Sequence, residues 1–350
     1  MTEGDGRGSH DAGGGWPGWP GLPAASPQAG GIPFRPLSLG EIFNGAITSM
    51  RRSPAATLGM AALLSVAASL ATALFTLEVN HLRGAGRVAG PAAAAWVDGA
   101  DILITFAANT LSLGAVAVVV SRSVLGMSTS LSQVWQFARP RLPVLLGTTG
   151  LLLLVYCALW IPFALVLAVA VGTGQPTVIL LLLLAGLVTV LAEVAGWTLL
   201  SMSAVVVVLE RAGPAAALRR FWQLARTRFW RILGILLLTA LIYFVISEII
   251  ALPFIGGELA VAGGLGGFHV SDLSVALAGL GGIVAGTIAR PFLAGATAML
   301  YCDTRMRGEG VDLVLRSSGA VRPQSGDADS PWPSPGPGFA AQVRPDEAAW

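Results

Sequence analysis

Two stretches of this sequence, Leu131–Gly147 (LSQVWQFARPRLPVLLG) and Leu218–Gly234 (LRRFWQLARTRFWRILG), decide the fold. They align without a gap, and seven of the fifteen positions from Gln133 and Arg220 onward are identical. Chance would give about one identity in a chain of this composition. In each stretch an apolar stripe with helical spacing is followed by arginines and then by a long apolar run. This order is typical of an amphipathic helix on a membrane surface that leads into a membrane-spanning helix.

A third, weaker copy of the stripe lies near the N-terminus. It consists of Leu39, Ile42, Phe43 and Ala46, with Arg51 about one helical turn further along than the alignment requires. Together the copies predict three repeats with a period near ~87 residues. A unit of this length holds one surface helix and two membrane spans.

The composition is that of an integral membrane protein. The chain has 350 residues, of which 54% are hydrophobic and 11% charged, with a mean hydropathy of +0.73; soluble domains carry about 25% charged residues. All 21 basic residues are arginine, and the formal net charge is +2. Because these arginines form no continuous basic face, we expect no nucleic-acid partner. The two cysteines do not suggest a disulfide framework.

We therefore predict an all-α integral membrane protein with six transmembrane helices in a domain of residues 37–316. The expected spans are about 54–77, 101–120, 142–171, 177–209, 232–255 and 275–301. The overlong fourth span is expected to project at its inner end into the cytoplasm. The flanking segments 1–36 and 317–350 are rich in Gly and Pro, and their composition predicts disordered tails.

The distribution of arginine predicts the orientation. Nearly all arginines fall on the side of the two termini and the surface helices, whereas the opposite side holds Arg83 and Arg87. By the positive-inside rule both termini are cytoplasmic. The chemistry of the sequence, with arginine in place of all lysine, favours the plasma membrane of a bacterium with a GC-rich genome.

A polar motif closes the last span. It comprises Tyr301, Asp303, Arg305, Arg307, Glu309, Gly310, Asp312 and Leu313, and the segment after Arg307 is predicted to begin an incomplete fourth surface helix. With the three stripes, this motif resembles the membrane-domain family of bacterial glycerophosphoryl diester phosphodiesterases and its stand-alone actinobacterial relatives of unknown function. The resemblance covers about residues 35–316. It implies no phosphodiesterase activity, because no soluble stretch here is long enough for a catalytic domain.

Three charged residues fall inside the predicted spans, where charge is expensive and points to a functional site. Glu193 and Arg290 lie at similar predicted depths, so we expect an ion pair between the fourth and sixth spans, as a structural clasp or as part of a transport site. The alternative is that each faces water or extends to the interface. Glu248 lies near the outer interface, where a solvated carboxylate is expected.

The surface helices carry the predicted contacts with lipid. Phe43, Trp135 and Trp222 are expected to be interfacial anchors. Eight arginines are expected to contact anionic lipid headgroups: Arg51, Arg52, Arg139, Arg141, Arg219, Arg220, Arg226 and Arg228. Alternatively the surface helices form a collar on the ends of the spans or bind a membrane or envelope protein. Gly282 and Gly286 are expected to pack against another span of the same chain rather than to mediate dimerisation.

No catalytic motif is recognisable, and His81 and His269 have no metal-ligand spacing. We therefore expect no enzymatic activity, metal or cofactor. Two functions fit the sequence. The first is a membrane protein that organises anionic lipid or an envelope-associated partner through its surface helices. The second is a small transporter or lipid-handling permease with a cavity near Glu193 and Arg290.

Overall fold

The computed structural model describes residues 28–29, 32–33, 35–124, 126–173, 176–261 and 272–309. The chain is an all-α membrane protein, with six helices long and apolar enough to cross a bilayer. The predictions of disorder for the two tails fall largely outside the described residues, as do Gly310, Asp312 and His269. Ahead of the helices, β1 (Gln28–Ala29) and β2 (Ile32–Pro33) form a short antiparallel pair.

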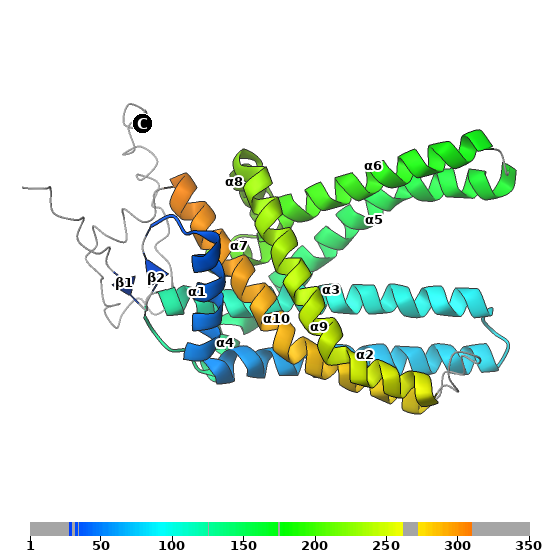
Figure 1. Cartoon of the computed structure of the whole chain (residues 1–350), viewed down its shortest axis with the longest axis horizontal. Helices are drawn as coiled ribbons and strands as arrows, with labels where there is room; N and C mark the ends of the chain where they lie inside the picture. The colour runs from blue at the N-terminus through cyan, green and yellow to red at the C-terminus, as the bar shows by residue number, and fades with distance from the viewer. Residues whose placement is uncertain are drawn as a thin grey trace, which may run out of the picture.

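Three short amphipathic helices each precede a long apolar helix (Figure 1). The first pair is α1 (Leu39–Arg52) and α2 (Pro54–Gly84). The next two share one succession of elements: α4 (Leu131–Ala138), η1 (Arg139–Arg141) and α5 (Leu142–Thr173), then α8 (Pro214–Ala225), η2 (Arg226–Arg228) and α9 (Phe229–Val261). The other helices are α3 (Gly90–Val124), α6 (Pro176–Leu200), α7 (Ser203–Leu209) and α10 (Asp272–Glu309).

The short helices begin at capping residues. A capping box begins α1: Ser38 accepts from the Glu41 amide, and the Glu41 carboxylate accepts from the Ser38 amide. This hydrogen bond from the backbone holds the pKa of Glu41 below its usual range. Ser130 and Gln133 form the same box at the start of α4.

The main bundle consists of the four long helices α2, α3, α9 and α10, and α10 lies at its centre. It packs against α9, α2, α3 and α1. Helices α5 and α6 pair as a hairpin, which contacts α3, α7, α8 and α9 and extends away from the main bundle (Figure 1). Its leucines, such as Leu154, Leu165 and Leu180, are more than 60% exposed, as expected for side chains that face lipid.

The fourth apolar segment is broken near Ser201, and its second part is buried. All residues of α7 are buried, and α7 packs against α3 and α8. The run Ala204–Leu209 explains this burial, because its apolar surface is removed from water inside the bundle. That the inner end of this span projects into the cytoplasm stays a prediction.

The last span extends further than the predicted end at Tyr301, since the residues from Asp303 to Glu309 continue α10 without a break. They stay helical because their charged side chains find partners on neighbouring helices, as described below. The residues predicted to form a fourth surface helix lie largely beyond the described part of the chain.

Small residues let α10 approach α2 closely. A Cβ atom on Gly282 would lie 3.1 Å from Ser69 Oγ, and one on Gly286 would lie 2.6 Å from Ser65 Oγ and 3.1 Å from the Arg290 guanidinium. The predicted packing of this glycine pair within the monomer is thus confirmed.

Replacement of Gly286 tests this contact. We expect Gly286→Ala to lower the apparent Tm of the purified protein in detergent, with a loss of about 1–3 kcal/mol, because the new methyl group overpacks the α10–α2 contact. Gly279→Ala is the matched control, since its Cβ would meet nothing within 4 Å. Equal Tm values for the two variants would contradict the assigned packing.

Candidate functional site

The bundle has two ends and a polar centre toward each. We call the end with α1, α4 and α8 the arginine-rich end, and the end with the α2–α3 and α9–α10 connections the hairpin end. One centre is a cavity between α2, α3, α9 and α10. The other is formed by the closing motif of α10 at the arginine-rich end.

The cavity has a volume of about 760 Å³ and is lined by all four helices of the main bundle. Six hydroxyl side chains line it: Ser69, Thr72, Thr76, Thr105, Tyr243 and Ser247. Three carboxylates and one guanidinium complete its polar lining. The Ser247 Oγ is buried and has no hydrogen-bond partner. The rest of the wall is apolar, so the cavity combines polar groups from all four helices with apolar surface.

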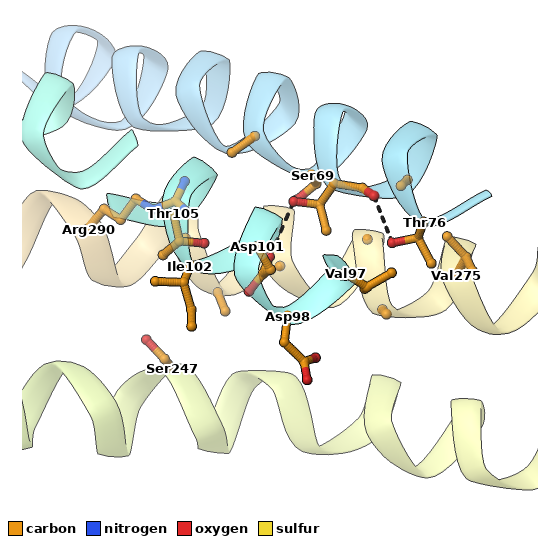
Figure 2. Close-up of a pocket in the computed structure, with 18 of the residues that line it drawn as sticks. Ser69, Thr76, Val97, Asp98, Asp101, Ile102, Thr105, Ser247, Val275 and Arg290 are labelled. Carbon is orange, nitrogen blue, oxygen red and sulfur yellow. Dashed lines mark hydrogen bonds between the residues drawn. The ribbon is translucent and has the colours of Figure 1, made fainter. Parts of the chain in front are cut away.

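Arg290 is the cation of the cavity. Its side chain is buried, with 7% exposed, and Nη1 donates to Ser65 Oγ at 2.9 Å. Its Nε has no hydrogen-bond partner. In Figure 2 Arg290 lies at one end of the cavity, close to Thr105 and Ser247. The arginine therefore presents an unsatisfied donor in the middle of a membrane helix.

The acidic residues of the cavity are Asp98, Asp101 and Glu248. Asp101 accepts from Thr72 Oγ1 at 3.2 Å. Figure 2 places Asp98 and Asp101 between Arg290 and the region of Thr76 and Val275, toward the hairpin end. All three carboxylates are exposed, which for Glu248 agrees with the predicted solvated group. No cluster of three or more metal-ligating side chains occurs among the described residues.

The predicted ion pair between Glu193 and Arg290 is not formed. Glu193 lies on α6 and accepts from Trp160 Nε1 of α5 at 3.4 Å, whereas Arg290 contacts Ser65 of α2. The prediction fails because α10 packs on α2, α3 and α9, while α6 pairs with α5 in the separate hairpin. Similar depth in the membrane did not make the two helices neighbours.

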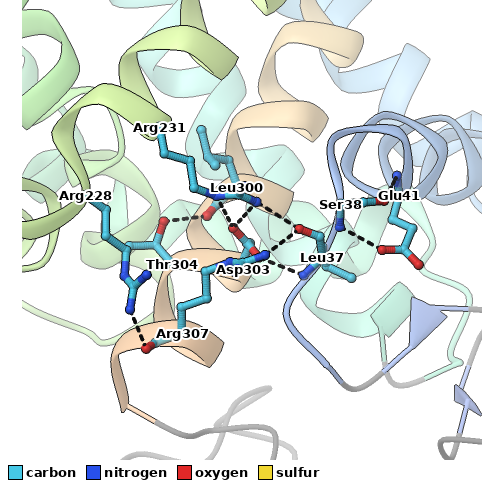
Figure 3. Close-up of polar contacts among 9 residues, drawn as sticks. All are labelled: Leu37, Ser38, Glu41, Arg228, Arg231, Leu300, Asp303, Thr304 and Arg307. Carbon is cyan, nitrogen blue, oxygen red and sulfur yellow. Dashed lines mark hydrogen bonds and ion pairs between the residues drawn. The ribbon is translucent and has the colours of Figure 1, made fainter. Parts of the chain in front are cut away.

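Two residues of the closing motif, Asp303 and Arg307, bind the start of the membrane domain (Figure 3). Asp303, 1% exposed, forms ion pairs with Arg231 of α9 at 3.0 Å and with Arg307 at 2.8 Å. The same carboxylate accepts from the Leu37 amide at 2.7 Å, and the Leu37 carbonyl accepts from both arginines. Arg228 donates to the carbonyl of Arg307 at 2.9 Å. We call Leu37, Arg231, Asp303 and Arg307 the Leu37 clasp.

Other motif residues, Tyr301, Arg305 and Glu309, connect α10 to α8 and to Glu210 at the end of α7. Tyr301 donates to Glu210 at 2.5 Å, and Arg305 pairs with Glu309 at 2.9 Å. Arg220 of α8 bridges Glu210 and Glu309. The motif thus neutralises its own charges at the protein interior. This network is a structural explanation for Tyr301, Arg305 and Glu309.

The eight predicted lipid-contacting arginines differ in their surroundings. Three have partners within the protein: Arg52 donates to the Ser123 carbonyl at 3.1 Å, and Arg220 and Arg228 make the contacts given above. Arg141 is half-buried. Four arginines are exposed on the outer faces of the short helices: Arg51, Arg139, Arg219 and Arg226. The charge of Arg220 is therefore used inside the fold, contrary to its predicted role.

The three stripes lie against the bundle, with one aromatic edge outward. Ile42, Val134 and Phe221 occupy the same position in each stripe and are fully buried. The next residue of the first stripe, Phe43, is half-buried, and the centroid of its ring lies 5.8 Å from that of Phe292. Its counterparts Trp135 and Trp222 are each 47% exposed. The short helices therefore form the collar that was the alternative prediction, and the tryptophans remain available to the interface.

Several residues of the two centres were not predicted from the sequence. Asp98 and Asp101, spaced i and i+3 at the start of a span, share a helix face and were a usable signal. Glu210 directly follows a buried valine-rich run, where a lone carboxylate needs a partner. By contrast, Leu37 enters the clasp through its backbone, and no side-chain pattern marks it.

Removal of the buried carboxylate tests the Leu37 clasp. We expect Asp303→Asn to lower the free energy of unfolding by about 2–3 kcal/mol, because two arginines then lose their shared anion in a buried site. Thermal unfolding in detergent measures the change. Glu41→Gln is the control, since its ion pair with the 51%-exposed Arg35 should contribute less than about 1 kcal/mol. Equal losses for both variants would show that the clasp adds nothing beyond a surface pair.

Comparison with curated proteins gives no match, and comparison with solved structures gives none either. A family model described as a domain of unknown function (DUF7847) matches residues 37–303. These limits are the two residues joined by the hydrogen bond between the Leu37 amide and the Asp303 carboxylate. The matched region thus includes all four helices that line the cavity and most of the closing clasp. The chain therefore belongs to the DUF7847 family of domains of unknown function, and its six long apolar helices make it a multi-pass membrane protein.

Proposed function

We propose that this protein is a non-enzymatic permease that binds a small polar compound in the cavity around Arg290. The observation that carries the proposal is the buried guanidinium of Arg290, which lies on the cavity wall and whose Nε has no hydrogen-bond partner. The second polar residue without a partner, Ser247, belongs to the same wall.

The energetics of Arg290 support a binding role. A charged arginine at the centre of a bilayer costs about 3 kcal/mol on insertion scales. A residue kept only for packing would be paired, as the arginines of the closing motif are. Arg290 instead has the Ser65 hydroxyl as its partner. The exposed carboxylates lie along the cavity, so its charge is left for water or an anionic group.

The packing of α1 supports access from one end. Met299 of α10 lies against Gly45, and a Cβ on Gly295 would lie 3.3 Å from Ala46. This contact fills the bundle on the arginine-rich side of Arg290, whereas the cavity wall continues to Thr76 and Val275 on the hairpin side. We propose that the arginine-rich end is cytoplasmic in a bacterial plasma membrane. The cavity then faces outward.

Cysteine labelling tests whether water reaches the cavity. In a background with Cys157→Ala and Cys302→Ala, we expect Thr105→Cys and Ser69→Cys to react with a small cationic, membrane-impermeant methanethiosulfonate added outside intact cells. The reason is that both side chains line the proposed aqueous cavity. Mass spectrometry of the purified protein measures the modified fraction.

Val116→Cys is the control, because Val116 is buried in the close-packed core with 1% exposed. It should stay unmodified. Absence of labelling at both cavity positions, in protein that retains the Tm of its background, would overturn the permease proposal.

A second candidate function is the organisation of anionic lipid by the collar. Trp135 with Arg139, and Trp222 with Arg226, place an exposed aromatic ring one helical turn before an exposed arginine. On α1 the exposed aliphatic side chain of Ile47 lies at the same spacing before the exposed Arg51. Such pairs suit the headgroup region, where a ring lies at the interface and the guanidinium attracts phosphate at about 1 kcal/mol per charge.

Native mass spectrometry tests the collar. We expect the double variant Arg139→Gln with Arg226→Gln to retain several-fold less phosphatidylglycerol than the wild type, because two exposed charges near the headgroups are lost. The control is Arg83→Gln with Arg87→Gln, which removes two exposed charges from the opposite end. The collar proposal fails if both double variants retain the same amount of lipid.

The resemblance to the membrane domains of bacterial glycerophosphoryl diester phosphodiesterases belongs with these proposals. The family match supports a membrane domain of unknown function. The residues of the closing motif on which the resemblance rests form the two ion-pair networks of α10. These contacts within the protein support a structural role for the motif.

A further inference from the structure

We infer that the ligand of the cavity is a dipolar compound that carries an acidic group and an amine, bound with the acid at Arg290 and the amine at Asp101. This inference rests on the proposed function. It adds the chemical class of the compound and its orientation between Arg290 and Asp101.

The acidic end follows from the donors at the closed end of the cavity. Arg290 has one hydrogen bond, to Ser65, and its Nε is buried without a partner. A guanidinium offers a fork of N–H groups that matches a carboxylate or phosphate. The Ser247 hydroxyl, also buried and without a partner, adds one more donor in the same part of the cavity (Figure 2).

The amine end follows from the acceptors nearer the hairpin end. Asp101 holds one hydrogen bond, from Thr72, which leaves further acceptor capacity on its carboxylate. Asp98 and Glu248 line the same cavity. A simple anion would be repelled by these three carboxylates on its way to Arg290. An ammonium group on the same molecule reverses that repulsion.

The contacts of α2 give the spacing. Ser65 binds Arg290, and Thr72 binds Asp101. These two residues lie about 10 Å apart along the helix, at a rise of about 1.5 Å per residue. Arg290 and Asp101 are therefore held at two different levels of the cavity, so that one ligand can contact both only if its acidic and basic groups are separated by a short linker. Phosphoethanolamine has both groups on such a linker, and it occurs free or as a lipid headgroup.

Calorimetry with three probes tests the inference on the full chain in detergent. We expect phosphoethanolamine to bind at least about tenfold more tightly than inorganic phosphate or ethanolamine, since each of these engages one end of the cavity. Asp101→Asn should reduce phosphoethanolamine binding about tenfold and leave phosphate binding unchanged or tighter. Glu193→Gln is the matched control, because this intramembrane carboxylate lies outside the cavity and should alter neither affinity.

Nanodiscs distinguish the two sources of the ligand. In discs of phosphatidylglycerol the soluble probe should bind; when phosphatidylethanolamine is added, loss of that binding identifies the lipid headgroup, and unchanged binding identifies the free compound. Equal affinity for phosphate and phosphoethanolamine would overturn the dipolar class, as would Asp101→Asn without effect or the failure of phosphoethanolamine to bind. The cysteine labelling described above is independent of these probes, so the permease proposal stands or falls separately.

Discussion

The close approach of α10 to α2 across Gly282 and Gly286 is the contact on which the membrane domain depends. It brings the backbones near enough for Ser65 to accept from Arg290, and it fixes the depth of the only cation on the cavity wall among the described residues. Where the two helices continue toward the hairpin end, α3 and α9 contribute polar side chains, and a cavity takes the place of close packing. In a bilayer there is no hydrophobic driving force between helices, so such small-residue contacts determine which faces meet.

One helix carries two different solutions to the cost of charge in a membrane protein. At the arginine-rich end, the closing motif of α10 meets opposite charges from α8, α9 and its own next turn, and buried Asp303 has two cationic partners. At mid-helix, Arg290 has a serine. A buried charge without its counter-ion is expensive, so a protein retains one where a ligand or water supplies the missing partner. This difference separates the structural network from the proposed binding site.

The sequence predicted the helices themselves better than it predicted which helices pack against one another. Apolar runs and stripes have lengths and periods that identify spans and surface helices, and Ser38 caps α1 as its capping box indicates. The pairing of spans depends on which faces fit, and Glu193 and Arg290 show that equal depth is insufficient information. The sequence suggested a cavity near Arg290 but placed Glu193 beside it, and the residues that line it were not predicted because they come from four helices. The threefold repeat remains a prediction, although Ile42, Val134 and Phe221 share one buried position.

The Leu37 clasp has a consequence for biosynthesis. Its hydrogen bond joins residues that are 266 positions apart in the chain, so the clasp forms only after the last helix has left the ribosome and entered the membrane. Contacts of such long range are late steps in folding. Until then Asp303 does not exist as a partner for the N-terminal segment, and α1 lacks the α10 surface on which it packs. A truncated chain would therefore leave the collar open at α1, a state that quality-control proteases can distinguish from the finished protein.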